Sequence, residues 1–250
     1  MLKYLVKRII ILIPVVICIS IMLFGISKMM PGDPVRAMLP TSLKEAQYEA
    51  AYNAMYERLG LDKSLPEQYI RWMANLLQGE FGYSSSFNRD VKLVVAEPLR
   101  NTIILNVFVN IFYLLIAIPI GIKCATKRGS VFDNGWQVFS LITYSMPSFF
   151  LALSLIYFFG IKLGWLPMGG MPNTAISSGA DLYMDWLRHL VLPVVTLVII
   201  SVASAIRYVR NAMIEALSQD YVRTARAKGL SEKVVIYSHA FRNALIPVSF

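Results

Sequence analysis

Four uncharged runs of apolar residues divide the chain, and each is close to the length of a membrane-spanning helix. They cover residues 9–26, 103–122, 139–161 and 190–206, and a bilayer core needs about 20 apolar residues in a helix. Buried helices of a large soluble protein are the alternative, but a 250-residue soluble domain rarely contains four such runs. The pattern predicts an all-α, polytopic transmembrane helix bundle forming a single domain.

The first run also resembles a secretory signal peptide, because basic residues precede an apolar stretch. Lys3, Lys7 and Arg8 form the basic start. The apolar run is longer than the usual 7–15 residues of a signal peptide, and no small-x-small cleavage site precedes residues 29–32. We therefore interpret 9–26 as an uncleaved transmembrane helix.

The segment between the first two runs, residues 27–101, is long enough to fold by itself. Two capping-box patterns, Ser42 with Glu45 and Ser64 with Glu67, each precede an amphipathic stretch. The apolar stripes either pack against the helix bundle or dock an external partner, and packing is the more general role of such stripes. They consist of Tyr48, Tyr52, Met55, Tyr56 and Leu59 in the first stretch and Ile70, Met73 and Leu77 in the second.

The charges decide the orientation. The chain has 24 basic and 15 acidic residues and a net charge of +9. The segments before the first run and after the second and fourth hold 13 of the basic and four of the acidic residues, which accounts for the whole excess. Because Lys and Arg concentrate in cytoplasmic loops, we place these segments and the N-terminus in the cytoplasm and 27–101 outside. The basic excess then indicates a membrane orientation and not nucleic-acid binding.

Composition excludes several other classes of protein. Hydrophobic residues make up 56% of the chain and charged residues 16%, against about 25% charged in soluble domains. Two cysteines and two histidines exclude a disulfide framework and an ordinary His-rich metal site. The sequence contains no phosphate-binding loop, HExxH, GxSxG or CxxC motif. We expect no catalytic residue, no metal ligand and no bound cofactor, so a separate subunit must supply any ATP-derived energy.

Polar residues recur inside the apolar runs. A polar side chain in lipid is costly and usually faces a bundle interior or a cavity. Such residues either line a translocation path or hydrogen-bond between packed helices, and both interpretations stay open here. The candidates for a translocation path are Asn106, Asn110, Tyr113, Tyr144 and Ser148.

The segment 207–243 differs from the other loops because it is long and strongly charged, with seven basic and three acidic residues. Its pattern predicts a helix, a break at Gly229 and a second helix. A charged helical surface of this kind either lies on the membrane or docks a cytoplasmic protein.

Three stretches of the chain resemble the permease subunits of ATP-binding-cassette importers for dipeptides, oligopeptides and nickel. The first runs through Met1–Pro34 and ends in a Pro-Gly-Asp-Pro sequence, and the second covers residues 60–82. The most specific reads DYVRTARAKGL from Asp220, followed by HAFRNALIP from His239. A cytoplasmic loop is typical of these importers, and this sequence resembles the form of the loop found in the peptide and nickel branch.

The resemblance implies a type I importer fold and a location in a bacterial or archaeal cytoplasmic membrane. It also implies a mechanism. The helix before Gly229 would be a coupling helix seated on a cytoplasmic ATPase. The implied partners are a second homologous permease subunit, two ATPase subunits that bind ATP and Mg²⁺, an extracytoplasmic substrate-binding protein and the lipid bilayer. The implied coupling residues are Tyr221, Arg223, Thr224, Ala225, Arg226, Lys228, Gly229 and Leu230.

The family normally continues for two spanning helices beyond the equivalent of Pro247, so the resemblance implies that the last two helices of the fold are missing from these 250 residues. Peptide is the preferred substrate and nickel the alternative, because the runs carry no cluster of metal ligands. Two other classes of protein compete with an importer. A membrane-embedded enzyme would need ionisable residues, yet the four runs contain no Asp, Glu or His. A membrane scaffold would use the basic segment 207–243 to bind anionic lipid.

Overall fold

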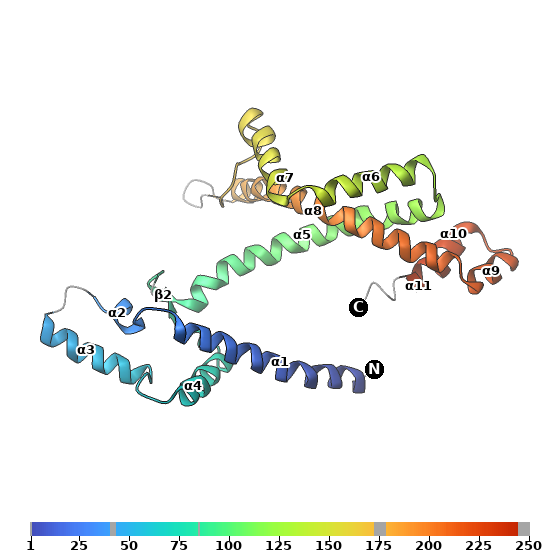
Figure 1. The fold of residues 1–250 in the computed structure, drawn as a ribbon. Helices are drawn as coiled ribbons and strands as arrows, with labels where there is room; N and C mark the ends of the chain where they lie inside the picture. The colour runs from blue at the N-terminus through green and yellow to red at the C-terminus, as the bar shows by residue number, and fades with distance from the viewer. Residues whose placement is uncertain (1, 41–43, 85, 173–178, 245–250) are drawn as a thin grey trace. The chain divides into compact units, whose positions relative to one another are not determined.

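A computed structural model describes residues 2–40, 44–84, 86–172 and 179–244. Two units are compact by themselves, Met1–Leu99 and Arg100–Phe250, and Figure 1 gives the order of their helices. Nearly all of the regular structure in the described residues is helical, which confirms the predicted all-α class. Ser42 of the first capping box and the last three residues of the family motif, 245–247, lie outside the described residues.

The first unit begins with α1 (Leu2–Met29), which contains the predicted run 9–26. Three helices and a small hairpin follow: α2 (Pro34–Met38), α3 (Glu45–Arg58), α4 (Leu65–Leu77), β1 (Tyr83–Ser84) and β2 (Arg89–Asp90). The two strands pair antiparallel, with Tyr83 opposite Asp90. The helices that the capping boxes predicted are therefore present as α3 and α4, although the Ser64 side chain makes no capping hydrogen bond.

Aromatic residues attach α4 to α1. The ring of Phe24 lies 5.6 Å from that of Tyr69 and 5.9 Å from that of Trp72, measured between centroids. The hydroxyls of Tyr69 and Ser20 are hydrogen-bonded at 2.7 Å. Of the predicted stripe of α4, Met73 is half-buried, whereas Ile70 and Leu77 are 65% and 81% exposed. The packed face of α4 is marked instead by Tyr69 and Trp72, aromatic residues that carry a polar group and that a stripe of purely apolar residues leaves out.

A carboxylate at the end of α1 organises the next two helices. Asp33 caps α2 by accepting from the backbone N–H groups of Val35 and Arg36, and Pro34 occupies the first turn. The Tyr52 hydroxyl of α3 donates to the other Asp33 oxygen at 2.7 Å. This hydrogen bond is the main cause of a lowered pKa of the Asp33 carboxyl. The Pro-Gly-Asp-Pro sequence therefore builds a junction between α2 and α3.

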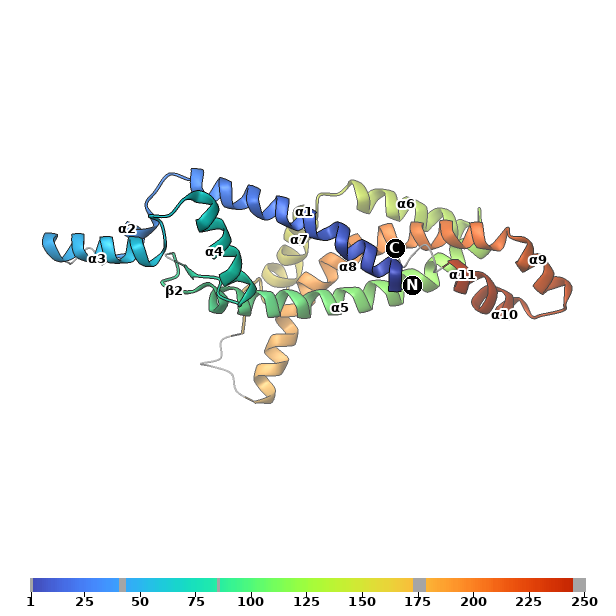
Figure 2. The same ribbon diagram turned by 90° about the horizontal axis from the view of Figure 1, so that it is seen from below.

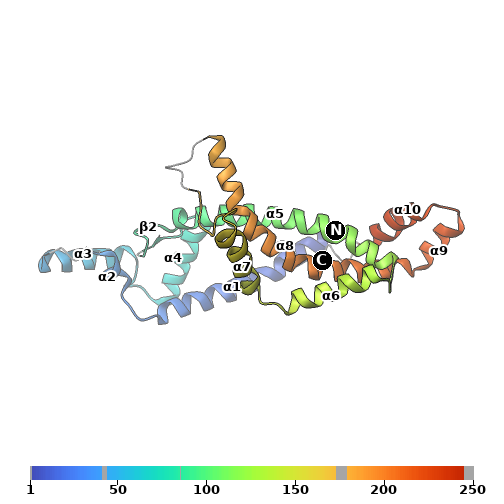
Figure 3. The same cartoon turned by 90° about the horizontal axis from the view of Figure 1, so that it is seen from above.

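The second unit contains most of the core. The chain passes into this unit within α5 (Val91–Thr126). The next elements are α6 (Val131–Ser145), α7 (Ser148–Leu155), the π-helical η1 (Ile156–Lys162) and α8 (Ala180–Leu217). Then come α9 (Asp220–Ala227), α10 (Glu232–Val234), the π-helical η2 (Val235–Phe241) and α11 (Arg242–Ala244). Figures 2 and 3 both show α6 beside α8, and α9 and α10 at the end of α8 that is farther from α7.

Among the described residues, three helices are long and apolar enough to cross a membrane, namely Val6–Met29 of α1, α5 and α8. The predicted run 139–161 is not one straight helix, because α6 and α7–η1 meet at an angle of 98°. Met146, which precedes Pro147, is extended with ψ 125°. Proline disfavours the helical region for the residue before it, and this explains the break.

Two further differences concern helix ends. The single helix predicted before Gly229 in the segment 207–243 is divided in two, because α8 continues to Leu217 and α9 begins at Asp220. The predicted outer segment 27–101 likewise overlaps α5, which begins at Val91. Pro193 lies inside α8, whereas Pro147 is the N-cap of α7.

Candidate functional site

The helix with the family motif, α9, is short and has well-defined ends. Asp220 lies in its first turn and Arg226 in its last, where each charge is favourable to the helix dipole. Gly229 then adopts φ +77°, and its N–H donates to the Arg226 carbonyl at 2.9 Å. Glycine adopts this left-handed conformation without the strain that a Cβ brings. The motif thus produces one helix of two turns and a sharp reversal.

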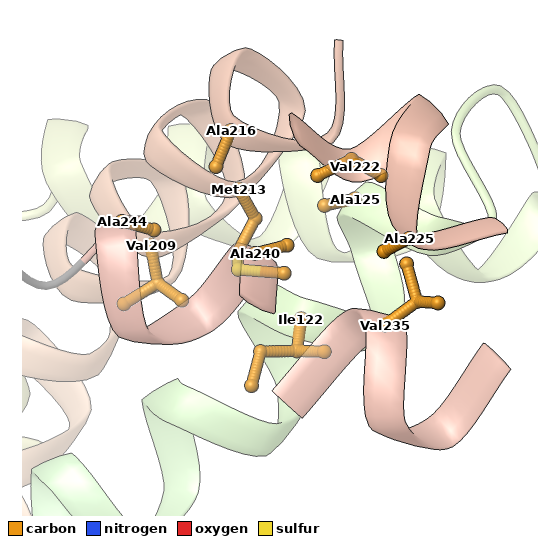
Figure 4. Close-up of a cluster of buried hydrophobic side chains, with 10 residues drawn as sticks. All are labelled: Ile122, Ala125, Val209, Met213, Ala216, Val222, Ala225, Val235, Ala240 and Ala244. Atoms are coloured by element: carbon orange, nitrogen blue, oxygen red, sulfur yellow. The ribbon is translucent and has the colours of Figure 1, made fainter. Parts of the chain in front are cut away.

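One face of α9 is buried in the chain's own core. Val222 is 0% exposed and Ala225 is 4% exposed. Figure 4 shows both side chains converging with residues of α5, α8, η2 and α11. The other members of this cluster are Ile122, Ala125, Val209, Met213, Ala216, Val235, Ala240 and Ala244. The helix is therefore packed against several other parts of the unit.

The remaining coupling residues face outward. Tyr221 and Leu230 are 38% and 40% exposed, and the side chain of Arg223 is 78% exposed. Thr224, Lys228 and Gly229 are exposed as well. Arg226 forms a hydrogen-bonded ion pair with Glu232 across the reversal, at 2.7 Å from its Nε. Ala225 differs from the other predicted coupling residues because its side chain points into the chain's own core.

The candidate path residues fall into two groups. Asn106, Asn110 and Tyr113 share a face of α5 by helical spacing. The two asparagine side chains are exposed, and their amides donate to the carbonyls of Thr102 and Asn106 in the same helix at 2.8 and 2.7 Å. Tyr113 is half-buried and packs on a second apolar cluster that joins α5 to α8.

The second group flanks the bend between α6 and α7. Tyr144 is 76% exposed, and Ser148 is also exposed. The bend forms an open apolar groove lined by Leu141, Ile142, Ser145, Met146, Pro147, Phe149 and Phe150. The Ser145 hydroxyl donates to the Leu141 carbonyl of its own helix, just as the two asparagines of α5 bond within theirs. The structure therefore does not assemble the five candidates into one site.

One structural pair is not predicted from the sequence, where its two members count only as charges. Asp133 of α6 and Arg210 of α8 are 77 residues apart and form an ion pair of 2.6 Å. The signal in the sequence was a lone acid just before the third apolar run. Within the described ranges, no group of three or more His, Cys, Asp or Glu residues is placed to hold a metal ion.

Comparison with known proteins is consistent with this geometry. Residues 117–250 match the family model described as binding-protein-dependent transport system inner membrane component, and residues 1–89 match the model of its N-terminal part. The second unit, including α9, thus lies almost wholly within the first match.

Curated relatives align along nearly the whole chain. A di/tripeptide transport system permease protein of Pseudomonas aeruginosa is 38% identical over 99% of this chain and 77% of its own length. A dipeptide transport system permease protein of Alkalihalophilus pseudofirmus is 37% identical over 99% and 78%. An oligopeptide transport system permease protein of Bacillus subtilis is 35% identical over 99% and 77%. The chain is therefore a multi-pass membrane protein that belongs to the family of binding-protein-dependent transport system inner membrane components.

Proposed function

We propose that this chain is the permease subunit of an ATP-driven importer and translocates peptides delivered by an extracytoplasmic binding protein. The observation that carries the substrate class is the set of relatives, which are 35–38% identical over 99% of the chain and are named as di/tripeptide, dipeptide and oligopeptide permeases. The family description supports dependence on a binding protein. None of these names favours nickel, so nickel serves as the competitor in the test.

We further propose that α9 is the coupling helix, seated on a cytoplasmic ATPase. Its exposed face carries Tyr221, Arg223 and Lys228, which could pair with acidic and apolar groups of a partner. Two ATPase subunits would hold ATP and Mg²⁺, and a second homologous permease would complete the path. Asn106, Asn110 and Tyr144, which are exposed in this chain, are suited to face that second subunit or the path.

The packing of α9 explains how a movement could pass into the membrane. Because Val222 and Ala225 are buried in one cluster with residues of η2, α8 and α5, α9 cannot shift alone without opening a cavity in that cluster. Closure of the ATPase pair on ATP would therefore move α9 and the adjoining end of α8 together. Such rigid-body switching between two states would open the helix bundle toward the binding protein.

The orientation is a separate proposal, with the N-terminus and α9 in the cytoplasm. It is supported by the 13 basic and four acidic residues that share that side. We expect Arg223→Cys in a Cys18→Ser background to react with a membrane-impermeant maleimide in inside-out vesicles but not in intact cells. Labelling of intact cells would contradict the orientation.

The function itself is tested by uptake into proteoliposomes that contain the full importer complex. We expect labelled dipeptide or oligopeptide to accumulate only with ATP inside the compartment that holds the ATPases and with binding protein on the other side. Nickel ions should neither accumulate nor compete. Accumulation of nickel without peptide, or uptake that is independent of ATP, would overturn the proposal.

A further inference from the structure

A buried ion pair joins α6 to α8. The carboxylate of Asp133 is 1% exposed and the side chain of Arg210 is 14% exposed. Arg210 donates from Nε to Oδ1 at 2.6 Å and from Nη2 to Oδ2 at 2.8 Å. Two parallel hydrogen bonds of this kind fix the relative orientation of the two groups as well as their distance.

Neighbouring groups hold both members in place. The Gly129 N–H donates to Oδ2 of Asp133 at 2.9 Å, and the Ser130 hydroxyl caps α6 by accepting from the Asp133 N–H at 3.3 Å. With its amide oxygen turned toward Arg210, Gln137 accepts from Nε at 3.0 Å and from Nη2 at 3.1 Å. The carboxylate is thus fixed to the turn before α6, and the guanidinium is held from two positions of that helix.

The pair lies next to the core that supports α9. Arg210 directly follows Val209, which belongs to the same buried cluster as Val222 and Ala225 of α9. At the other end of α6, the chain bends by 98° into α7. A displacement of α9 would therefore be passed to α8 close to Arg210, the residue through which α8 binds α6.

Apolar packing alone would transmit such a displacement less faithfully. Hydrophobic contact is non-directional, so two helices that touch only through apolar side chains can slide or rotate with little loss of buried area. A two-point hydrogen-bonded pair breaks when either helix rotates or slides. Buried ion pairs are weak evidence for stability, and some are retained for structural specificity.

We propose that Asp133 and Arg210 are positioning residues that make α6 follow α8 when α9 moves, so that the bend between α6 and α7 responds to the ATPases. The inference rests on the proposed function. It assigns to the pair a role in the coupling of ATP hydrolysis to transport, distinct from contact with peptide, ATP or the ATPase.

The test uses the assembled importer in proteoliposomes and measures ATP hydrolysed per peptide taken up. Arg210→Lys keeps the charge but removes the planar fork. The double variant Asp133→Leu with Arg210→Met replaces the pair by apolar groups, which commonly preserves stability. The matched control is Arg188→Lys, the same substitution at an exposed position of α8 that is remote from the pair.

We expect both pair variants to assemble and hydrolyse ATP, with the ratio of ATP to peptide raised by about twofold to thirtyfold. The Arg188→Lys control should keep the wild-type ratio. A wild-type ratio in both pair variants would overturn the inference. Failure of both to assemble would assign the pair to folding and would overturn it as well. A wild-type complex that takes up no peptide would contradict the proposed function instead.

Discussion

Gly121 lies where α5 and α8 approach closely, and the variant Gly121→Ala tests that approach. A Cβ at this position would lie 2.7 Å from both Cβ and Cγ1 of Val209 and 3.2 Å from the Ile206 carbonyl oxygen. Carbon atoms in ordinary contact are about 3.5–4.0 Å apart. The clash involves the stiff β-branched Val209 and the backbone, so the two helices must separate to admit the methyl group.

The expected cost follows from two opposing terms. Overpacking of a tight interior costs about 1–3 kcal/mol, whereas replacing a helical glycine by alanine returns about 1 kcal/mol of helix propensity. Gly121→Ala should therefore destabilise the protein by up to about 2 kcal/mol. Gly135→Ala is the matched control, because Gly135 lies in α6, is exposed and would have no neighbouring atom within 4 Å of an added Cβ. The control should gain up to about 1 kcal/mol.

The assay is denaturation of the purified importer complex in mixed micelles, which reports the free energy of unfolding for each variant. The reciprocal variant Gly121→Ala with Val209→Gly moves the small residue to the facing helix, and its cost should be smaller than the sum of the costs of the two single changes. Close approach through small residues is a principal source of helix association in lipid. Equal stability of Gly121→Ala and Gly135→Ala would refute this account of the crossing.

Three further predictions concern α9 and the α2–α3 junction. Val222→Ala, at 0% exposure, should lower the free energy of unfolding by about 1–3 kcal/mol in the same assay, whereas Arg223→Ala should weaken only co-purification of the ATPase. At Gly229, with φ +77°, alanine should cost about 1–2 kcal/mol and reduce peptide uptake more than asparagine does. The hydrogen bond from Tyr52 lowers the pKa of the Asp33 carboxyl in the folded protein. The stabilisation from this bond is therefore complete above the pKa that Asp33 has in the unfolded chain, and it is lost as the pH falls through the pKa that Asp33 has in the folded protein. The protection of the α3 amides against hydrogen exchange, relative to their intrinsic exchange rates, should fall in acid. Tyr52→Phe should lower this protection at neutral pH and remove most of its pH dependence.

Hydropathy locates the apolar stretches of the chain, but the helices extend beyond these stretches. The fourth run, residues 190–206, lies inside α8, which extends from Ala180 to Leu217. Charged residues such as Arg207 end the apolar run without ending the helix, because Arg is a good helix former. The sequence therefore located the apolar middle of α8 and could not locate the ends from hydropathy alone.

Four prolines lie in the apolar runs, and they show what neighbouring residues alone cannot determine. Pro14, Pro119 and Pro193 lie inside α1, α5 and α8, whereas Pro147 lies between α6 and α7, at a bend of 98°. Each proline removes one hydrogen-bond donor and crowds the preceding turn. Whether the helix continues depends on the packing of both halves against neighbours, and α6 and α7 each have their own contacts with α8. That packing is not encoded in the residues next to the proline.

The pair Asp133–Arg210 shows a second limit. Counted by charge, both residues belong to the side with excess Lys and Arg, and the count treats them only as neighbours of the membrane. Their partnership depends on the register of α6 against α8, because the residues are 77 positions apart. A single sequence carries no signal for such register. An acid placed just inside an apolar helix indicates that a partner exists without indicating which one.

The motif on α9 combines two requirements that the sequence could not separate. Val222 and Ala225, three residues apart, face the core, while Tyr221, Arg223 and Thr224 face outward. The inner pair must be small and apolar, because α9 contacts η2 and shares a buried cluster with Met213 and Ala216 of α8. In the described structure the outer residues are exposed, Arg223 pairs with Asp220, and the Thr224 hydroxyl donates to the Asp220 carbonyl, so packing does not limit the size of these side chains. A loss of transport with intact stability should therefore map to the outer face, and a loss of both to the inner one.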